Sequence, residues 1–358
     1  MMLLNNAIKS NVDEDILFVQ RNRTRRLNLD LSKASVTQIM YAYQEKRNKT
    51  NSNYSLQGAI GIIKSMEQAE RNLLKEEWPG PYLPIDICSE FWVSFEKYYV
   101  NTPSSTGRKR HASSAETYAN QIIASLAWSQ TYGAQLDPTF RDKKFSHYSK
   151  KKVTPSQDQI SLIYHYDLDV KENRIKIRAL AKEMGFSRFS FTTLKKVRDH
   201  FVLSCSIGQR ISDSKRIDKL SFSNDIYEVT QQKTGNKAKV DLKECSIDYD
   251  VVKEILEKYN YKAPAYGIDT GNFNNYLHLL CRAIGGSFNR VIVWEYKEGN
   301  EIKRESAFMW QLMSSHVARR TFITFQLETN KQSLSKVMSE SGHADTRNLH
   351  KYFAPEHQ

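Results

Sequence analysis

Five residues near the C-terminus have the types and the order that phosphodiester chemistry requires. His316 and Arg319 stand three positions apart, so on a helix they share one face and can both reach a single phosphate. Gly342 and His343 follow, and Tyr352 comes nine residues after His343. Cutting a phosphodiester without a metal needs an oxygen nucleophile, fixed cations on the non-bridging oxygens and a proton donor for the departing oxygen. A phenol, a guanidinium and two imidazoles are candidates for these roles.

Two upstream segments add a second guanidinium and an ammonium group. Arg210 follows a largely apolar segment that we predict to be helical, and Asp213 lies three residues beyond it. Lys233 belongs to a Gln-Lys-Thr-Gly segment that we expect at the tip of two short strands. Lys237 and Lys239 lie on the same turn and are alternatives to Lys233.

Three further residues have suitable chemistry but the wrong spacing. Arg320 stands beside Arg319, and we interpret it as a surface or phosphate-contacting residue because the HxxR register selects Arg319. His350 and Tyr296 lie outside the spacing of the other candidates. The chain has 19 tyrosines, so a core or surface position is the default for those other than Tyr352.

The elements expected before residue 150 are helices. Apolar residues at helical spacing predict an amphipathic helix over Leu56–Leu73, and the segment 78–84, with three prolines and a glycine, ends it. An aromatic-rich helix is predicted over Phe91–Tyr99, and another from Ser113 to Gly133. We therefore predict a domain boundary at the proline-rich segment, followed by a compact helical domain.

The elements expected after residue 153 are helices with a few antiparallel strands. Thr154 is predicted as the N-cap of a helix and Pro155 as its first residue. Further helices are predicted over 194–206, 251–259 and 273–284, and strands over 220–229, 239–242, 290–296 and 301–306. This pattern predicts a mainly α fold with small antiparallel β-sheets.

The charge balance favours a polyanionic partner. The formal net charge is +13 and the pI is near 9.3, which suits nucleic acid or an anionic surface. No apolar stretch reaches the length needed to cross a bilayer, and the four scattered cysteines indicate neither a zinc site nor a disulfide framework. We expect a soluble, cytoplasmic, nucleoid-associated protein without a metal centre, since carboxylates and histidines do not cluster at ligand spacing.

Basic runs outside the catalytic candidates are possible phosphate contacts. A run at Arg21, Arg23, Arg25 and Arg26 fits a DNA backbone or a solvated hairpin equally well. A basic loop and a basic linker are further candidates for DNA binding: Arg108, Lys109, Arg110, Lys143, Lys144, Lys150, Lys151 and Lys152. A solvated linker is the alternative for the last five.

The order Arg, Lys, HxxR, GH, Tyr resembles that of the tyrosine recombinase family, also called the phage integrase family. Each element alone is common, but the five in this order and spacing are specific. Carried over residue by residue, the resemblance implies that Arg210 and Arg319 bind the scissile phosphate. It implies further that neither arginine can be replaced even by lysine. It also implies that His316 and His343 donate hydrogen bonds and help to move the nucleophile's proton.

The remaining roles follow from the same resemblance. Lys233 would protonate the leaving 5′ oxygen as general acid, and Tyr352 would attack to form a 3′-phosphotyrosyl link. A 5′ hydroxyl of a partner strand would then reverse the step, so no ATP, metal or other cofactor is required. Asp213 matches an acidic position that we assign to orienting Arg210 or its helix.

The resemblance covers roughly Leu83 to the end. It implies a helical, SAM-like core-binding domain over 81–142, a basic linker over 143–153 and a mixed α+β catalytic domain over 154–358. Residues 1–80 match no motif, and by analogy we expect them to bind accessory arm sites. The partners implied are double-stranded DNA, three further copies in a homo-tetramer on paired sites, and an accessory DNA-bending protein.

The family pattern is not complete, and two rival functions stay open. Only six residues follow Tyr352, so the C-terminal helix that many relatives pass to a neighbouring subunit is short or missing. The expected function is site-specific recombination for integration or excision of a mobile element. A type IB topoisomerase and a catalytically silent DNA-binding relative are the alternatives.

Overall fold

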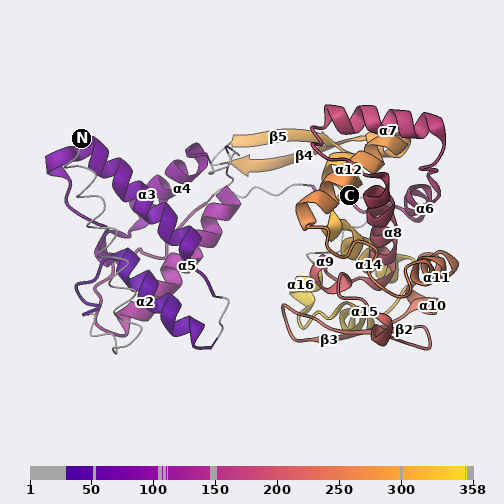
Figure 1. The fold of residues 1–358 in the computed structure, drawn as a ribbon. Coiled ribbons are helices and arrows are strands. Elements are labelled where there is room, and N and C mark those ends of the chain that lie inside the picture. Colours follow the sequence, from indigo (N-terminus) through magenta and orange to yellow (C-terminus); the bar gives the residue numbers. More distant parts are fainter. Residues whose placement is uncertain are drawn as a thin grey trace. The chain divides into compact units, whose positions relative to one another are not determined.

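The chain folds into two compact units, one of residues 1–149 with 296–303 and the other of residues 150–295 with 304–358 (Figure 1). The computed structural model describes residues 30–50, 54–103, 107, 110, 112–145, 151–298, 301–350 and 352. Helices dominate, and the strands form one three-stranded and one two-stranded sheet. This is the mainly α fold with small antiparallel sheets that the sequence predicts. In the ranges described, no helix is long and apolar enough to cross a membrane.

The described residues of the first unit form four α-helices around an aromatic core. They are α2 (Val36–Asn48), α3 (Gln57–Leu74), α4 (Ser89–Asn101) and α5 (Ala112–Gln130). Ser35 and Gln38 form a capping box that starts α2. Trp92 of α4 is almost fully buried, and its Nε1 donates a hydrogen bond to the Phe140 carbonyl at 2.9 Å. Leu73, at the end of α3, is 80% exposed and does not join this core.

The core of the first unit continues across the proline-rich segment, where the sequence predicts a domain boundary. Ile60 of α3 and Trp92 of α4, on either side of the segment, belong to one buried cluster. The backbone of Tyr82 accounts for this continuity. Its carbonyl accepts a hydrogen bond from the Val36 amide at 2.9 Å, and its own amide donates to Glu67 Oε1 at 3.0 Å. The segment ends α3 but folds back onto α2 and α3, so 30–145 form one unit.

The second unit surrounds the helix α8 (Phe191–Ile207), which contacts helices on several sides (Figure 1). Eleven of the 17 residues of α8 are buried. The other helices of the unit are α6 (Gln157–His165), α7 (Lys171–Glu183), α9 (Ile211–Ser214), α10 (Leu242–Cys245), α11 (Tyr249–Lys258), α12 (Thr270–Ile284), α13 (Met309–Leu312), α14 (Ser315–Glu328), α15 (Leu334–Ser341) and α16 (Thr346–His350). Among them, α6, α11, α12 and α14 pack directly on α8.

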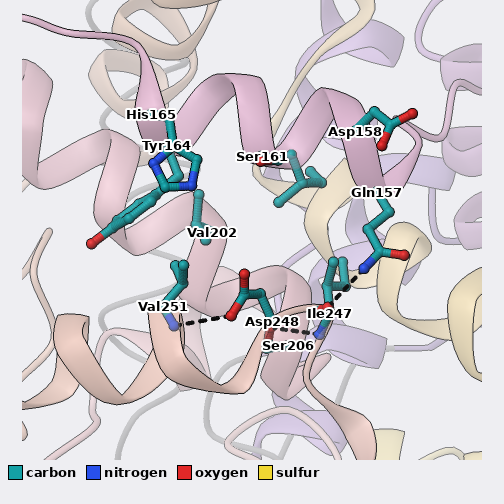
Figure 2. A pocket seen from close by; sticks show the side chains of 11 residues that line it. Gln157, Asp158, Ser161, Tyr164, His165, Val202, Ser206, Ile247, Asp248 and Val251 are labelled. Carbon is teal, nitrogen blue, oxygen red and sulfur yellow. Dashed lines mark hydrogen bonds between the residues drawn. The ribbon is translucent and has the colours of Figure 1, made fainter.

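Helix α6 starts two residues later than the sequence predicts. Ser156, not Thr154, is the N-cap, because Ser156 and Gln159 form a capping box in which each side chain accepts a hydrogen bond from the other residue's amide. Gln157, in the first turn, donates its Nε2 to the Ile247 carbonyl at 3.1 Å (Figure 2). A small cavity of about 170 Å³ lies between α6, α8 and the loop before α11 (Figure 2), and no predicted catalytic residue lines it.

One turn of the three-stranded sheet carries the candidate residue Lys233. Its strands β1 (Phe222–Ser223), β2 (Ile226–Thr230) and β3 (Lys237–Asp241) pair in sequence order and antiparallel. The single strand predicted over 220–229 is a hairpin, because Asn224 and Asp225 both adopt positive φ and reverse the chain. Strands β4 (Val291–Glu298) and β5 (Glu301–Phe308) form the second sheet, as predicted.

A buried carboxylate ties α8 to α11. Asp199 of α8 is fully buried and accepts hydrogen bonds, each of 2.8 Å, from Arg198 Nε, Lys258 Nζ and the Tyr259 hydroxyl. Removing this buried carboxylate alone is costly, because its three donors then lose their acceptor.

We expect Asp199→Ala to lower the free energy of unfolding of the second unit by about 3 kcal/mol. Hydrogen exchange of the α8 and α11 amides in the full chain, followed by mass spectrometry, measures this quantity for that unit. Asp169→Ala is the control, because Asp169 pairs with Lys195 and Arg174 at the exposed surface, and we expect little change. Equal exchange in the two variants would contradict the role of the buried carboxylate.

Candidate active site

The end of α8 brings Arg210 next to helix α14. Gly208 ends α8 with φ of +64°, a left-handed conformation that glycine adopts without strain. A Cβ at this position would lie 2.3 Å from the Phe322 ring of α14, so the two helices approach this closely only at a glycine. The Gly208 carbonyl accepts a hydrogen bond from Arg319 Nη1 at 3.0 Å. Arg210 follows two residues later, as the N-cap of α9.

Arg210 and Arg319 share a region without a carboxylate partner. Arg319 is 1% exposed, and its Nη2 lies 3.0 Å from His343 Nε2, while its Nε has no hydrogen-bond partner among the described residues. Arg210 Nη1 donates to the Gln231 amide oxygen at 2.7 Å. Burial lowers the pKa of Arg319 to about 10, and the charge of Arg210 acts in the same direction. In the part of the chain that the structure describes, these guanidinium groups meet neutral acceptors only, which favours binding of an anion.

The ring of Tyr352 lies against the side chains of His343 and Arg319. The centroid of its ring is 5.2 Å from that of His343 and 5.3 Å from Arg319 Cζ. Helix α15 ends at Gly342 with φ of +66°, which turns the chain so that His343 faces Arg319. Tyr352 follows α16 and its amide donates to the Leu349 carbonyl at 2.8 Å. Arg319, His343 and Tyr352, separated in sequence, thus form one cluster.

His343 is held as a neutral imidazole. Burial, together with the charges of Arg319 and Arg210, lowers its pKa to about 3. Its Nδ1 lies 2.7 Å from the Ser341 hydroxyl, which fixes the ring orientation. A neutral imidazole keeps one ring nitrogen without a proton, so it can accept a proton from a neighbouring phenol.

His316 and Lys233 border the same region. His316 is one turn before Arg319 on α14 and is exposed as a residue. Partial burial of its ring lowers its pKa, and four nearby cations add to this effect: Arg320, Arg319, Arg210 and Lys233. Lys233 itself is exposed on the turn between β2 and β3. The predicted candidates of both halves of the motif therefore meet at one site.

Asp213 has a partner that the sequence did not indicate. It is fully buried, and its Oδ1 accepts hydrogen bonds from the Gln232 amide at 2.8 Å and from Arg216 Nη2 at 3.0 Å. Arg216 also donates to the Thr230 carbonyl at 2.7 Å. The Asp213 side chain therefore joins α9, which begins after Arg210, to the turn that carries Lys233. Its expected role of orienting Arg210 or its helix stays a prediction.

The predicted DNA-binding cations fall into three groups. Arg108, Lys109 and Lys150, like the arginine run at 21–26, lie outside the described residues. Arg110 packs over the Tyr99 ring, with Cζ 5.0 Å from its centroid, and Lys143 pairs with Glu116 at 3.0 Å. Those that are exposed are Lys144, Lys151 and Lys152. DNA contact by any of them stays a prediction.

The alternative candidates have other environments. Lys239 pairs with Glu228 at 3.0 Å on the sheet surface, and Lys237 is exposed at the start of β3. Arg320 is half-buried and donates to the Val153 carbonyl at 3.1 Å, so it anchors the chain just before α6. His350 is exposed on α16, and Tyr296 belongs to β4.

Sequence reasoning missed two glutamines that link the site's segments. Gln209 and Gln231 are each 1% exposed, and Gln231 Nε2 donates to Gln209 Oε1 at 2.8 Å. The signal available in the sequence was their adjacency to candidates, since Gln209 precedes Arg210 and Gln231 stands two residues before Lys233. Polar residues at such positions usually face solvent, so adjacency alone did not select them.

We expect His343 to remain neutral between pH 8 and pH 5. The ordinary pKa near 6.5 is lowered in the fold, so the folded chain resists protonation while the unfolded chain takes up a proton. This contribution to stability is complete above pH 6.5 and is lost as the pH falls toward 3. The ¹⁵N chemical shifts of the imidazole ring measure the protonation of His343 as a function of pH, and the His343→Gln variant assigns the signal. A titration midpoint near 6.5 in the unmodified chain would be incompatible with this site.

Comparisons with known proteins agree with this arrangement of elements. No protein-family model and no curated protein matches the sequence. A lambda integrase dimer bound to a COC′ core site matches at a TM-score of 0.56 and 15% identity, over 99% of this chain and 87% of that one. The Tn1549 transposon integrase in complex with right-end DNA matches at 0.53 and 11%, over 90% and 95%. XerH recombinase bound to a difH substrate matches at 0.50 and 13%, over 88% and 82%. The chain therefore has the tyrosine recombinase fold.

Proposed function

We propose that this protein is a site-specific DNA recombinase that cuts and rejoins strands through a 3′-phosphotyrosyl link on Tyr352. The observation that carries the proposal is that Arg319 lies against the Tyr352 ring and close enough to Arg210 for their charges to interact, while both guanidinium groups have neutral hydrogen-bond acceptors only. Two uncompensated guanidinium groups favour an anion with several oxygens, and a phosphodiester fits this requirement. A nucleophilic oxygen next to that anion supports strand cleavage rather than simple binding.

The proposed reaction balances within the residues of one site. The Tyr352 oxygen attacks phosphorus, and the bond from phosphorus to the 5′ oxygen breaks. The phosphate stays bonded to the 3′ oxygen of the cut strand and is now also bonded to tyrosine. His343 accepts the phenolic proton, and a phosphate bound by the arginines makes it more basic by offsetting their charge. Lys233 gives a proton to the leaving 5′ oxygen, and His316 donates a hydrogen bond to the phosphate. Attack by another 5′ hydroxyl reverses each step.

The setting of this reaction is also part of the proposal. We infer duplex DNA as substrate and assembly of several copies on paired sites, as in the lambda integrase tetramer bound to a Holliday junction that this fold resembles at a TM-score of 0.51 and 15% identity. Integration or excision of a mobile element is the corresponding biological role. Residues 1–80 would then read arm sites and 81–142 the core site, although 30–145 share one unit.

We expect Tyr352→Phe to abolish a covalent adduct with DNA, because the ring remains but the nucleophilic oxygen is gone. The assay uses nicked suicide substrates made from the DNA flanking the gene, and protease digestion maps the adduct on the unmodified chain. Tyr296→Phe is the matched control and should leave the adduct unchanged. An adduct in the Tyr352→Phe variant would remove Tyr352 as nucleophile. If a monomer of the protein instead relaxes supercoiled plasmids that lack the site, this result would favour a type IB topoisomerase.

We expect Arg319→Lys to slow cleavage by at least about 100-fold, the usual effect of removing a fixed transition-state donor. Lysine keeps the charge but cannot donate to the Gly208 carbonyl and lie against His343 at once. Single-turnover cleavage of the suicide substrate measures the rate. Arg320→Lys is the neighbouring control, and its rate should stay near that of the unmodified chain. Similar rates for the two variants would argue against a phosphate site at Arg319.

A further inference from the structure

Gln231 is the most highly connected side chain of the candidate site. It is 1% exposed and follows β2 directly. Its Oε1 accepts hydrogen bonds from Arg210 Nη1 at 2.7 Å and from the Thr234 hydroxyl at 3.0 Å. Its Nε2 donates to Gln209 Oε1 at 2.8 Å and to the Ser341 carbonyl at 2.7 Å. A primary amide has two acceptor positions and two donors, so all four are used.

These four bonds join three segments that are far apart in the sequence. One is the α8–α9 junction with Arg210, the second is the β2–β3 turn with Lys233, and the third is the end of α15, just before His343. Gln209 reinforces the first and third segments, since its Nε2 donates to the Glu340 carbonyl at 2.8 Å. Asn236, beyond the turn, donates to the Gly342 carbonyl at 3.1 Å. The three segments that carry Arg210, Lys233 and His343 therefore meet at this network.

The chemistry of an amide suits this position better than that of an acid. A neutral oxygen orients the Arg210 guanidinium but leaves its full charge for an incoming phosphate, whereas a carboxylate would neutralise it. A carboxylate would also bring a negative oxygen against Gln209 Oε1 and the Ser341 carbonyl, which need donors. The amide thus fixes both arginine geometry and the position of the turn.

We propose that Gln231 is a positioning residue that aligns Arg210, the Lys233 turn and the His343 segment around one phosphate. This inference rests on the proposed function, because it assigns a purpose to the alignment. Gln231 itself touches neither the phosphate nor the leaving group. Its loss should therefore reduce the rate of the chemical step through Arg210 and Lys233 while DNA still binds.

The test compares Gln231→Met with Gln326→Met in the full chain. Gln326 is also fully buried in the second unit, and its Nε2 donates to the Cys245 carbonyl at 2.7 Å, away from the candidate site. The two variants carry the same change at equal burial, so thermal unfolding should fall by a similar amount in both. We expect Gln231→Met to slow suicide-substrate cleavage by about 100-fold with DNA affinity within about threefold, and Gln326→Met to cleave normally.

A substrate with sulfur in place of the 5′ bridging oxygen separates positioning from general damage. A thiolate leaves without a proton, so the substrate removes the need for Lys233 but not for Arg210. The ratio of the sulfur rate to the oxygen rate should rise at least about tenfold in Gln231→Met and stay unchanged in Gln326→Met. An unchanged ratio in Gln231→Met, or cleavage equal to the control, would overturn the proposal.

A second variant covers the case in which the methionine chain does not fold. Gln231→Glu keeps the acceptor for Thr234 but adds a charge beside Arg210, so cleavage of both substrates should fall by more than 100-fold. Normal cleavage by this variant would also overturn the proposal. Absence of any adduct with the unmodified chain is a different result, because it counts against the proposed function itself.

Discussion

Burial of the Arg319 guanidinium without a counter-anion is the constraint around which the second unit is organised. A charge removed from water needs hydrogen bonds from its surroundings, and here they come from the Gly208 carbonyl and the His343 ring. To supply them, α8 must end beside α14 and α15 must end beside both. The glycines at positions 208 and 342 make these close approaches sterically feasible. The arrangement leaves the positive charge uncompensated until an anion enters.

The same constraint explains the state of the neighbouring histidine. Burial and the charges of the two guanidinium groups disfavour protonation of His343, so its ring stays neutral and keeps one nitrogen that can accept a proton. Tyr352 lies against this neutral ring and not against an acid. In the proposed reaction, a bound phosphate would offset part of this positive charge and increase the basicity of His343 at the step in which the phenol loses its proton. The proposed mechanism thus couples phosphate binding to activation of the nucleophile through charge.

The mainly α fold was predicted correctly, and candidate residues for the site could be selected, because both depend on local or ordered signals in the sequence. Helical spacing located α3, α8, α11 and α12, and the motif order selected Arg210, Arg319, His343 and Tyr352. Non-local contacts were not predictable in this way. Helix α7 was missed because only Ile177 and Ala181 of its length are buried, a stripe too narrow to stand out among its charged residues.

The remaining differences between the predicted and the observed structure arise from tertiary hydrogen bonds. The backbone bonds of Tyr82 join the helices on both sides of the proline-rich segment into one unit, although the prolines alone favour a boundary. The bond from the Gln232 amide to Asp213 adds a contact between that carboxylate and the turn, which the sequence did not indicate. Neither bond has a periodic signature, since each joins residues whose distance in the sequence is arbitrary.

The close approach of Gly342 to Gln231 has an evolutionary consequence. A Cβ at position 342 would lie 2.3 Å from the Gln231 amide nitrogen, and the backbone there has a φ that glycine alone adopts readily. A larger residue at 342 therefore requires a shorter one at 231, and a shorter residue at 231 releases the three segments that it joins. The two positions, more than a hundred residues apart, should change together or not at all in homologous chains.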